Sequence, residues 1–358
     1  MKSFTAGSGF FKLIAVCISV EVMRYIYLLM LLSVAGHASG QTTGGPGKKS
    51  PTRVAEIHPG AVWMDDRDSV INAHGGGILF RKNKYYWYGE RRGSSASQGV
   101  NVYSSPDLLH WTYEGLALEQ ETTDTTSEIR TGCLMERPKV IYNDRTRQYV
   151  MWFHLELKGK GYKAARAGVA VSDRPTGPFR YLGSMRPNGN MSRDMTLFKD
   201  TNGDAYLVYS SRENYDLHIA RLTNDYLSVT AADSMVFSKH REAPAVMKYK
   251  HQYYMITSGC TGWKPNEAWL HRAPTMLGPW ERVPGNPMRG PGAALTFDAQ
   301  STYILPVQGK KQAYVFMADR WKPGDLKDSR YIWLPVSFRE DIPKVEWSDA
   351  WNLETSRR

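Results

Sequence analysis

One strand-like pattern returns five times along this chain and limits what the chain can fold into. Each copy is a polar pair or turn followed by an aromatic-rich run. The copies are NKYYWYGE (83–90), RQYVMWFH (147–154), DAYLVYSS (204–211), HQYYMITS (251–258) and KQAYVFMA (311–318). Aligned on one tyrosine, they lie 48 to 63 residues apart, and turn-forming residues precede most of them. This arrangement predicts hairpins of short strands inside a repeat architecture.

The segments between the copies favour an all-β fold. They contain short strand-like runs separated by Gly, Pro, Asn and Asp, and no convincing long amphipathic helix. Five β-units of this size, with about four strands each, predict a five-bladed β-propeller. We assign residues 56–358 to it, and no separate binding module is visible. A β-sandwich with coincidentally similar strands is the alternative.

The first 40 residues differ from the rest in composition. The apolar run over 25–36 follows Arg24, is too short to span a bilayer, and has the length of a signal-peptide core. We predict a signal peptide over 1–40, with Met23 as an alternative start, and a flexible linker over 41–55. An uncleaved membrane anchor is the other interpretation. The expected location is secreted or periplasmic, with no membrane span after signal removal.

Cysteine usage and charge exclude several function classes. Only Cys133 and Cys260 lie in the mature part, and two free thiols are favoured over a disulfide between them. Neither a CxxC motif nor zinc-ligand spacing is present. The formal net charge is +11, but Lys and Arg are scattered among acids, so no nucleic-acid partner is predicted. A basic surface without a special partner is favoured over an affinity for acidic glycans.

The strand before each repeated hairpin supplies the candidate site. In a propeller the first strands of all blades converge on the axis, so polar residues at their ends meet there. These strands are NAHGGGIL (72–79), MERPKVIY (135–142), SRDMTLFK (192–199), REAPAVMK (241–248) and FDAQSTYIL (297–305). Their polar residues are His74, Glu136, Asp194, Glu242 and Gln300. Three acids that enter one pocket from three blades are typical of a glycosidase.

The stretch HGGG (74–77) has two interpretations. It could be the oxyanion loop of an esterase, but that enzyme also needs a G-x-S-x-G nucleophile elbow, which does not occur. We therefore interpret it as the entry to the first blade, with glycines that let the backbone approach a sugar closely.

Taken in order, these motifs resemble glycoside hydrolase family 43, the inverting five-bladed propeller enzymes. REAPAVMKYKHQYYMITS resembles the family's general-acid strand, and SRDMTLFKDTNGDAYLVYSS resembles the strand with its pKa-modulating Asp. SSPDLLHW (104–111), SDRPTGPF (172–179) and APTMLGPW (273–280) are similar to its outer-strand signatures. The resemblance covers roughly residues 60–340.

One position departs from the family pattern. Most members open the first blade with an Asp as general base, where this chain has AHGGG. The nearby Asp65, Asp66 and Asp68 are interpreted as a polar turn. With ERPK, EAPAV and DAQST present, the chain resembles the subgroup of exo-acting galactan 1,3-β-galactosidases, in which a Gln of the fifth blade occupies the base position. Gln300 matches it, which implies release of galactose from β-1,3-galactan, the backbone of arabinogalactan.

The resemblance implies a role for each central residue. Glu242 is the expected general acid, so its pKa must be raised, and Asp194 is its ionised neighbour. Gln300 is a very weak base, so we expect it to hold the water or to act through an unusual tautomer in a proton relay. Glu136 is the competing base, although the resemblance makes it a sugar ligand beside Arg137. Inversion predicts about 6.5–9.5 Å between the acid and the water-holding group.

Four more residues are candidate sugar contacts, and three of them have a structural alternative. Glu90 could instead be an exposed strand-end charge, Trp263 a core side chain, and His74 a structural histidine. Asn214 is a candidate wall residue. No metal ligand set is apparent and no cofactor is predicted. Some relatives hold an ion on the propeller axis, but an axial calcium is not predicted here.

Two other functions stay open. An α-L-arabinofuranosidase or β-xylosidase is the commoner family activity, but it needs the missing first-blade Asp. A catalytically dead propeller would bind a glycan without turning it over. We expect a monomer that acts on a polysaccharide or oligosaccharide.

Overall fold

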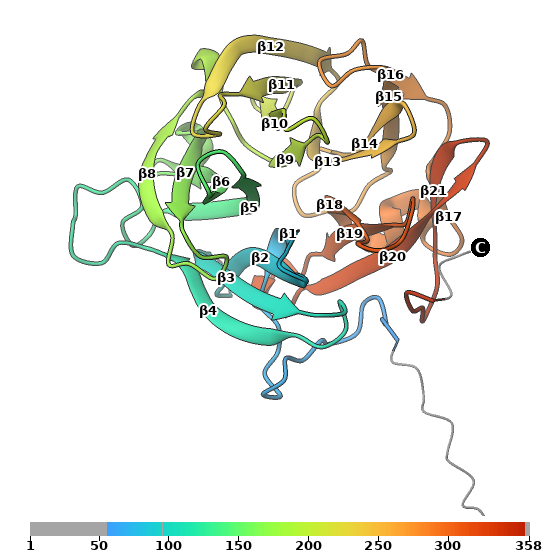
Figure 1. Ribbon diagram of the computed structural model, residues 1–358, viewed down its shortest axis with the longest axis horizontal. Helices are drawn as coiled ribbons and strands as arrows, with labels where there is room; N and C mark the ends of the chain where they lie inside the picture. Colours follow the sequence, from blue (N-terminus) through green and yellow to red (C-terminus); the bar gives the residue numbers. More distant parts are fainter. Residues whose placement is uncertain (1–55, 95, 355–358) are drawn as a thin grey trace, which may run out of the picture. The chain divides into compact units, whose positions relative to one another are not determined.

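The computed structural model describes residues 56–94 and 96–354, which form five sheets arranged in a ring (Figure 1). Each sheet is built from one continuous stretch of chain, and neighbouring innermost strands contact one another around the ring. The predicted five-bladed β-propeller is therefore confirmed. The predicted signal peptide and linker lie outside the described residues.

Blades one to four are antiparallel meanders whose first strand in the chain is the innermost. Their strands are β1 (His74–Arg81), β2 (Lys84–Arg92), β3 (Ser97–Ser105) and β4 (Thr112–Glu119); β5 (Leu134–Asn143), β6 (Gln148–Glu156), β7 (Arg166–Ser172) and β8 (Arg180–Met185); β9 (Met195–Lys199), β10 (Ala205–Ser211), β11 (Asp216–Leu222) and β12 (Val229–Ser238); and β13 (Arg241–Tyr249), β14 (Gln252–Gly259), β15 (Trp269–Ala273) and β16 (Glu281–Val283).

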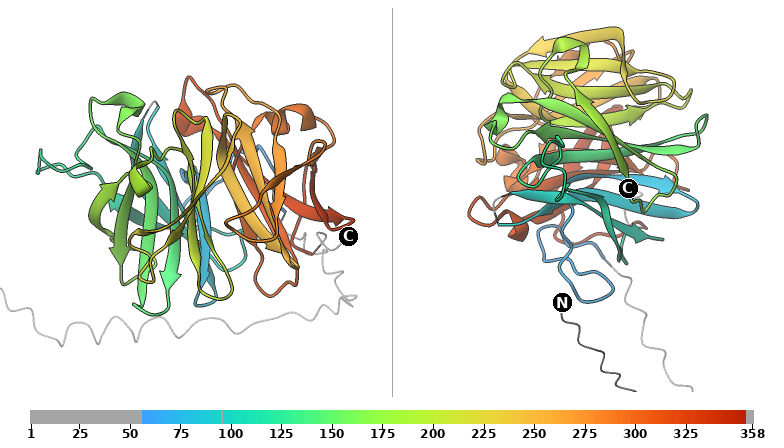
Figure 2. Two further views of the ribbon diagram at one scale, coloured as in Figure 1. Left: turned by 90° about the horizontal axis from the view of Figure 1, so that it is seen from above. Right: turned by 90° about the vertical axis from the view of Figure 1, so that its left-hand side faces the viewer.

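Blade five adds a short parallel strand at its outer edge. Its strands are β17 (Met288–Arg289), β18 (Gln300–Pro306), β19 (Tyr314–Arg320), β20 (Arg330–Arg339) and β21 (Ile342–Glu346), with β17 parallel to β21. The 3₁₀ turns in the loops are η2 (Gly161–Lys163), η3 (Pro187–Gly189), η4 (Ala293–Asp298) and η5 (Leu326–Asp328). In the side view of Figure 2 the strands run between two ends where the loops gather.

The five repeated runs are the second strands of the blades: β2, β6, β10, β14 and β19. Each pairs on both sides within its sheet and packs against neighbouring blades, so both of its faces are covered. Trp152, Tyr209 and Phe316 are accordingly fully buried. A strand covered on both faces reads as a continuous apolar run, which explains why the repeat was visible in the sequence.

Four innermost strands are irregular at the end where they begin. The pairing shifts register near the start of β1, β5, β13 and β18. In three of these shifts one residue has a left-handed backbone: Gly75 (φ 59°), Arg137 (φ 54°) and Ala243 (φ 53°). A β-bulge of this kind bends a strand and re-aims its side chains. These bulges set the directions of Glu136 and Glu242 beside them.

The ring closes between blades one and five through aromatic packing. The rings of Trp63, Trp87 and Trp333 contact one another, and those of Trp63 and Trp87 also contact the ring of Tyr331. The Tyr331 hydroxyl donates to the Ile71 carbonyl and accepts from the Ala73 backbone N–H, both at 2.9 Å. This cluster, the closure seam, joins the segment before β1 to β20.

Several smaller predictions can be compared with the structure. Cys133 is buried, Cys260 is partly buried, and both are free thiols. Asp65 accepts the backbone N–H groups of Arg67 and Ser69, as a polar turn requires. None of the helices in the described residues is long and apolar enough to cross a membrane.

Candidate active site

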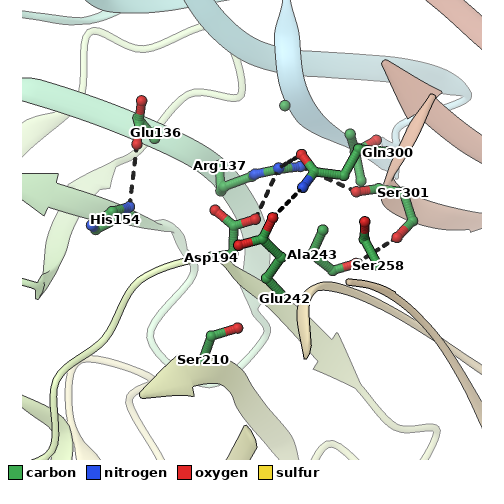
Figure 3. A network of polar contacts seen from close by, with 12 residues as sticks. Glu136, Arg137, His154, Asp194, Ser210, Glu242, Ala243, Ser258, Gln300 and Ser301 are labelled. Atoms are coloured by element: carbon green, nitrogen blue, oxygen red, sulfur yellow. Dashed lines mark hydrogen bonds and ion pairs between the residues drawn. The ribbon is translucent and has the colours of Figure 1, made fainter. Parts of the chain in front are cut away.

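A pocket of about 250 Å³ lies where the innermost strands begin, and all five blades contribute to its wall. Eight of the nine residues expected from the sequence line it, and His74 is the exception. The central contacts among them are drawn in Figure 3.

Glu242, the second residue of β13, is a buried carboxyl with two amide donors. Asn214 Nδ2 donates to its Oε2 at 2.8 Å, and Gln300 Nε2 donates to its Oε1 at 2.7 Å. Burial first, and then the charge of Asp194, raise the pKa of Glu242 to about 7. A carboxyl in this environment holds a proton near neutral pH and can act as a general acid.

Asp194 and Arg137 form the ionised side of the pocket. Asp194 directly precedes β9, and Arg137 Nη2 lies 2.9 Å from its Oδ2. The same guanidinium donates to the Ser301 carbonyl at 3.1 Å and to the Gln300 side chain. Arg137 therefore connects blades two, three and five beside Glu242 (Figure 3).

Gln300 is the first residue of β18 and is held at both ends of its amide. Its Oε1 accepts from Arg137 Nη2 and from Trp321 Nε1, the latter at 3.0 Å. Its Nε2 donates to Glu242. The separation expected for an inverting pair is therefore not present, because the two groups are hydrogen-bonded directly. A role of these two groups as an inverting pair would require this hydrogen bond to open when substrate binds, because a sugar carbon and a water lie between the two groups of such a pair.

Glu90 and Glu136 share one buried cation. Arg92 Nη2 forms an ion pair with Glu90 and lies 2.9 Å from Glu136 Oε1. The Arg137 backbone N–H donates to Glu90 Oε1 at 2.8 Å. Glu90 is only 1% exposed, so it is part of the pocket wall and not an exposed strand-end charge.

Glu136 is held ionised by three neighbours. Besides Arg92, the Tyr162 hydroxyl donates to it at 3.0 Å, and His154 Nδ1 lies 3.4 Å from its Oε2. Burial opposes ionisation, but Arg92 and His154 outweigh it and lower the pKa of Glu136. A carboxylate this well stabilised is a poor proton acceptor, which favours a role in binding a sugar hydroxyl over a role as base.

The three remaining candidates differ in position. Trp263 is 43% exposed at the pocket and packs edge-on against Trp321 at 5.4 Å, so it is not a core residue. Asn214 Oδ1 is buried without a hydrogen-bond partner among the described residues, and it can accept from a sugar hydroxyl. His74 is 0% exposed, with Nδ1 3.2 Å from Asp319 and its ring stacked on Tyr331. This position matches the structural alternative for His74.

The three glycines of HGGG make room for the protein's own atoms. A Cβ on Gly75 would lie 2.1 Å from Glu90 Oε1, and one on Gly76 would lie 2.1 Å from the Tyr88 carbonyl oxygen. A Cβ on Gly77 would lie 2.6 Å from Lys139 Cδ. The close approach that the structure shows is to side chains and backbone of blades one and two. A close approach of this backbone to a sugar stays a prediction.

Seven residues of the site were missed in the sequence: Arg92, His154, Tyr162, Arg193, Cys260, Gly262 and Trp321. Arg92 could have been found, because it stands two residues after Glu90 on the same face of a strand. Tyr162 and Trp321 come from loops, where no periodic pattern marks a residue that points into a pocket.

Within the described residues, no group of three or more His, Cys, Asp or Glu side chains is arranged to hold a metal ion. Arg92 and Arg137 lie next to the buried acids of the pocket, and a third basic side chain, Lys139, is buried beside them. Lys139 Nζ donates to the Gly75 carbonyl at 2.8 Å. Burial, and then the charge of Arg137, lower the pKa of Lys139 to about 7.

A protonatable carboxyl, an ionised neighbour and a polar wall in the mouth of a five-bladed propeller are the parts of a glycosidase site. The chain matches the model of glycosyl hydrolases family 43 over residues 75–337, and it belongs to this family. It is therefore a glycoside hydrolase.

Several solved structures are similar to the chain. A family 43 β-1,3-galactosidase with galactodeoxynojirimycin is 47% identical, with a TM-score of 0.81 over 83% of this chain and 100% of that one. An exo-β-1,3-galactanase from Phanerochaete chrysosporium, with β-1,3-galactotriose, is 36% identical, with a TM-score of 0.77 over 83% and 68%. The exo-β-1,3-galactanase from Clostridium thermocellum is 38% identical, with a TM-score of 0.76 over 83% and 66%. A comparison with curated proteins returns no match.

Proposed function

We propose that this enzyme is an exo-acting glycosidase that releases galactose from β-1,3-galactan, with inversion at the anomeric carbon. One observation carries the proposal: an amide, Gln300, faces the protonatable Glu242, while the start of the first blade, His74–Gly77, carries no acid. The similar enzymes with β-1,3-galactosidase or exo-β-1,3-galactanase activity support the same substrate.

The pocket wall binds the terminal galactose through its hydroxyl groups. Glu90 and Glu136 are fixed by Arg92 and accept hydrogen bonds from the sugar, and Asn214 Oδ1 accepts another. Trp263, at the mouth, offers an apolar ring face of the kind that packs on galactose. Because Arg92 already holds Glu90 and Glu136 in the absence of substrate, these two side chains need not be rearranged when the sugar binds.

Glu242 gives its proton to the glycosidic oxygen, and the C1–O bond breaks with its electron pair on the leaving oxygen. A water held by Gln300 attacks C1 from the opposite face, which inverts the anomeric centre. Once bonded to C1, this water is a strong acid, so it releases its proton to a pocket carboxylate or to solvent without needing a strong base. Asp194, paired with Arg137, keeps Glu242 protonated until it reacts.

Proton NMR of the enzyme with debranched β-1,3-galactan tests the proposal. We expect free galactose as the product, with the α-anomer appearing first and the β-anomer following by mutarotation. Glu242→Gln, assayed at the same loading, controls for contaminating activities and is expected to release almost none.

Each other outcome contradicts the proposal in its own way. Release of pentoses from arabinan or xylan would assign the chain to the arabinofuranosidase or xylosidase activities. Binding of galactan without product, equal in the parent and in Glu242→Gln, would make it a glycan-binding propeller. The β-anomer appearing first would overturn inversion while leaving the substrate assignment intact.

We propose that the enzyme is exported and acts as a monomer. The apolar run in residues 1–40 supports a cleaved signal, and a polysaccharide substrate fits a location outside the cytoplasm. N-terminal sequencing of the protein from its natural host is expected to begin near Gln41. A start at Met1 or Met23 would contradict cleavage, and a dimer mass in light scattering would contradict the monomer.

A further inference from the structure

The amide of Gln300 has a forced orientation. An arginine guanidinium and an indole N–H can only donate hydrogen bonds, so the atom that faces Arg137 and Trp321 must be the amide oxygen. Both lone pairs of Oε1 are then occupied. The nitrogen end is left for Glu242 and the pocket, so Gln300 presents N–H groups to the pocket and no free lone pair.

Trp321 is itself held in place by blades one and five. It directly follows β19, two residues after Asp319, which binds His74 Nδ1 at 3.2 Å and the Gly75 N–H at 2.8 Å. The His74 and Trp321 rings lie 5.9 Å apart. On its other sides the indole packs edge-on against Trp263 and lies near the Arg92 and Arg137 guanidiniums, at 5.5 and 5.8 Å.

The two donors to Gln300 differ in what else they do. Arg137 also neutralises Asp194 and binds the Ser301 carbonyl, so its removal would disturb several groups at once. The Trp321 N–H is directed at the amide oxygen, and this is the one polar hydrogen bond of its side chain among the described residues, the other contacts being with rings and guanidiniums. A substitution of Trp321 therefore removes one donor to the Gln300 amide without removing the ion pair of Asp194 or the hydrogen bond to the Ser301 carbonyl.

We propose that Trp321 is a positioning residue for the water-holding amide of the reaction. Its indole N–H occupies the second lone pair of Gln300 Oε1 and so keeps Nε2 turned to the nucleophilic water. His74, which stacks on Tyr331 of the closure seam, and Asp319 support the indole, which gives the HGGG segment an indirect role in catalysis. The inference rests on the proposed function, because it requires a water to be held opposite Glu242.

Trp321→Phe removes the N–H and keeps an aromatic ring. We expect kcat on β-1,3-galactan to fall about fivefold, as for the loss of one hydrogen bond of ~1 kcal/mol, with KM changed less than about twofold. Trp280→Phe is the matched control. It removes an indole N–H bonded to the Met276 carbonyl at 2.9 Å on blade four, outside the pocket, and should leave kcat unchanged.

The leaving group separates this role from a general structural effect. Trp321→Phe should lose the same factor on galactan and on an aryl β-galactoside with an acidic phenol, because water attack is common to both. Glu242→Gln should lose much less on the aryl substrate. Trp321→His keeps a ring N–H near the same oxygen and should recover part of kcat, and melting curves verify that each variant is folded.

Three results would overturn the inference: an unchanged kcat in Trp321→Phe, a rise in KM alone, or a loss that shrinks with the better leaving group. An unchanged kcat would show that Trp321 does not position Gln300. A rise in KM alone would make Trp321 a sugar contact. A loss that shrinks with the better leaving group would show that Trp321 acts on the general acid Glu242. If the parent enzyme releases no galactose, the proposed function itself fails, and this outcome is distinct from all three.

Discussion

The two ends of the innermost strands differ in geometry and in chemistry. Where the strands begin, four of the five shift register and carry buried charged or amide side chains around the active-site pocket. Farther along, β1 pairs with β2 residue by residue from Gly77 to Arg81. The far end surrounds a pocket of about 390 Å³ that is lined mainly by aliphatic and aromatic side chains, with a minority of polar and charged ones. One set of strands thus provides chemistry at one end and stability at the other.

This difference has an energetic basis. Buried charges and left-handed non-glycine residues such as Arg137 and Ala243 are unfavourable locally, the backbone strain alone by about 1–2 kcal/mol per residue. They persist because the surrounding structure fixes them. The regular hairpins of the far end and the aromatic closure seam provide the stabilisation that offsets this strain. Variants at the two ends should therefore separate activity from stability.

The largest effect on activity is expected from Glu242→Gln at the pocket end. Loss of a general acid lowers kcat by about 10²–10⁴-fold. Stability at pH 7 should change by less than about 1 kcal/mol, because the variant removes a carboxyl whose ionisation is unfavourable but also replaces one accepting oxygen by an NH2 group, which loses one hydrogen bond. Steady-state rates on galactan and melting temperatures at pH 7 measure the two effects. A variant that retains a tenth or more of the parent rate would exclude Glu242 as the acid.

The opposite result is expected from Ile304→Ala at the far end. Ile304 lies on β18, pairs with Phe316 and is almost fully buried. Removing three buried carbons should lower the free energy of unfolding by about 2–4 kcal/mol, with kcat of the folded enzyme unchanged. Urea unfolding and rates at low temperature test this. A large fall in kcat without a loss of stability would show that the two ends are coupled.

A matched pair of glycines sharpens the comparison. Gly75 and Gly309 both have a left-handed backbone, with φ of 59° and 72°. A Cβ on Gly75 would meet Glu90, whereas one on Gly309 has open space within 4 Å. Gly309→Ala should cost about 1 kcal/mol of stability and no activity. Gly75→Ala should cost more stability and also weaken galactose binding, because Glu90 has to move. Equal effects of the two variants on KM would contradict this account of HGGG.

The same division explains what could be predicted from the sequence. The far-end hairpins follow local rules, so the repeated runs identified the second strand of every blade. The residues of the pocket were found through their position at the start of each inner strand, and eight of nine line it. The direct contact between Glu242 and Gln300 was not foreseen, because it depends on bulges and on the loop residue Trp321. Such features arise from contacts between blades, which no local pattern encodes.

The smallest expected effect is a shift in pH dependence caused by Cys260. Burial and the charge of Asp194 raise the pKa of Glu242. A hydrogen bond from the Cys260 thiol favours the ionised form of Glu242 and lowers that pKa by a smaller amount. The acid is active when protonated, so activity falls as pH rises through about 7.

Cys260→Ala removes the donor and should move this alkaline limb upward by less than about one pH unit, or 1.4 kcal/mol. Cys260→Ser keeps a donor and should not move it. The pH profile of kcat for both variants decides, and a downward shift in Cys260→Ala would mean that the thiol acts on the pocket in another way.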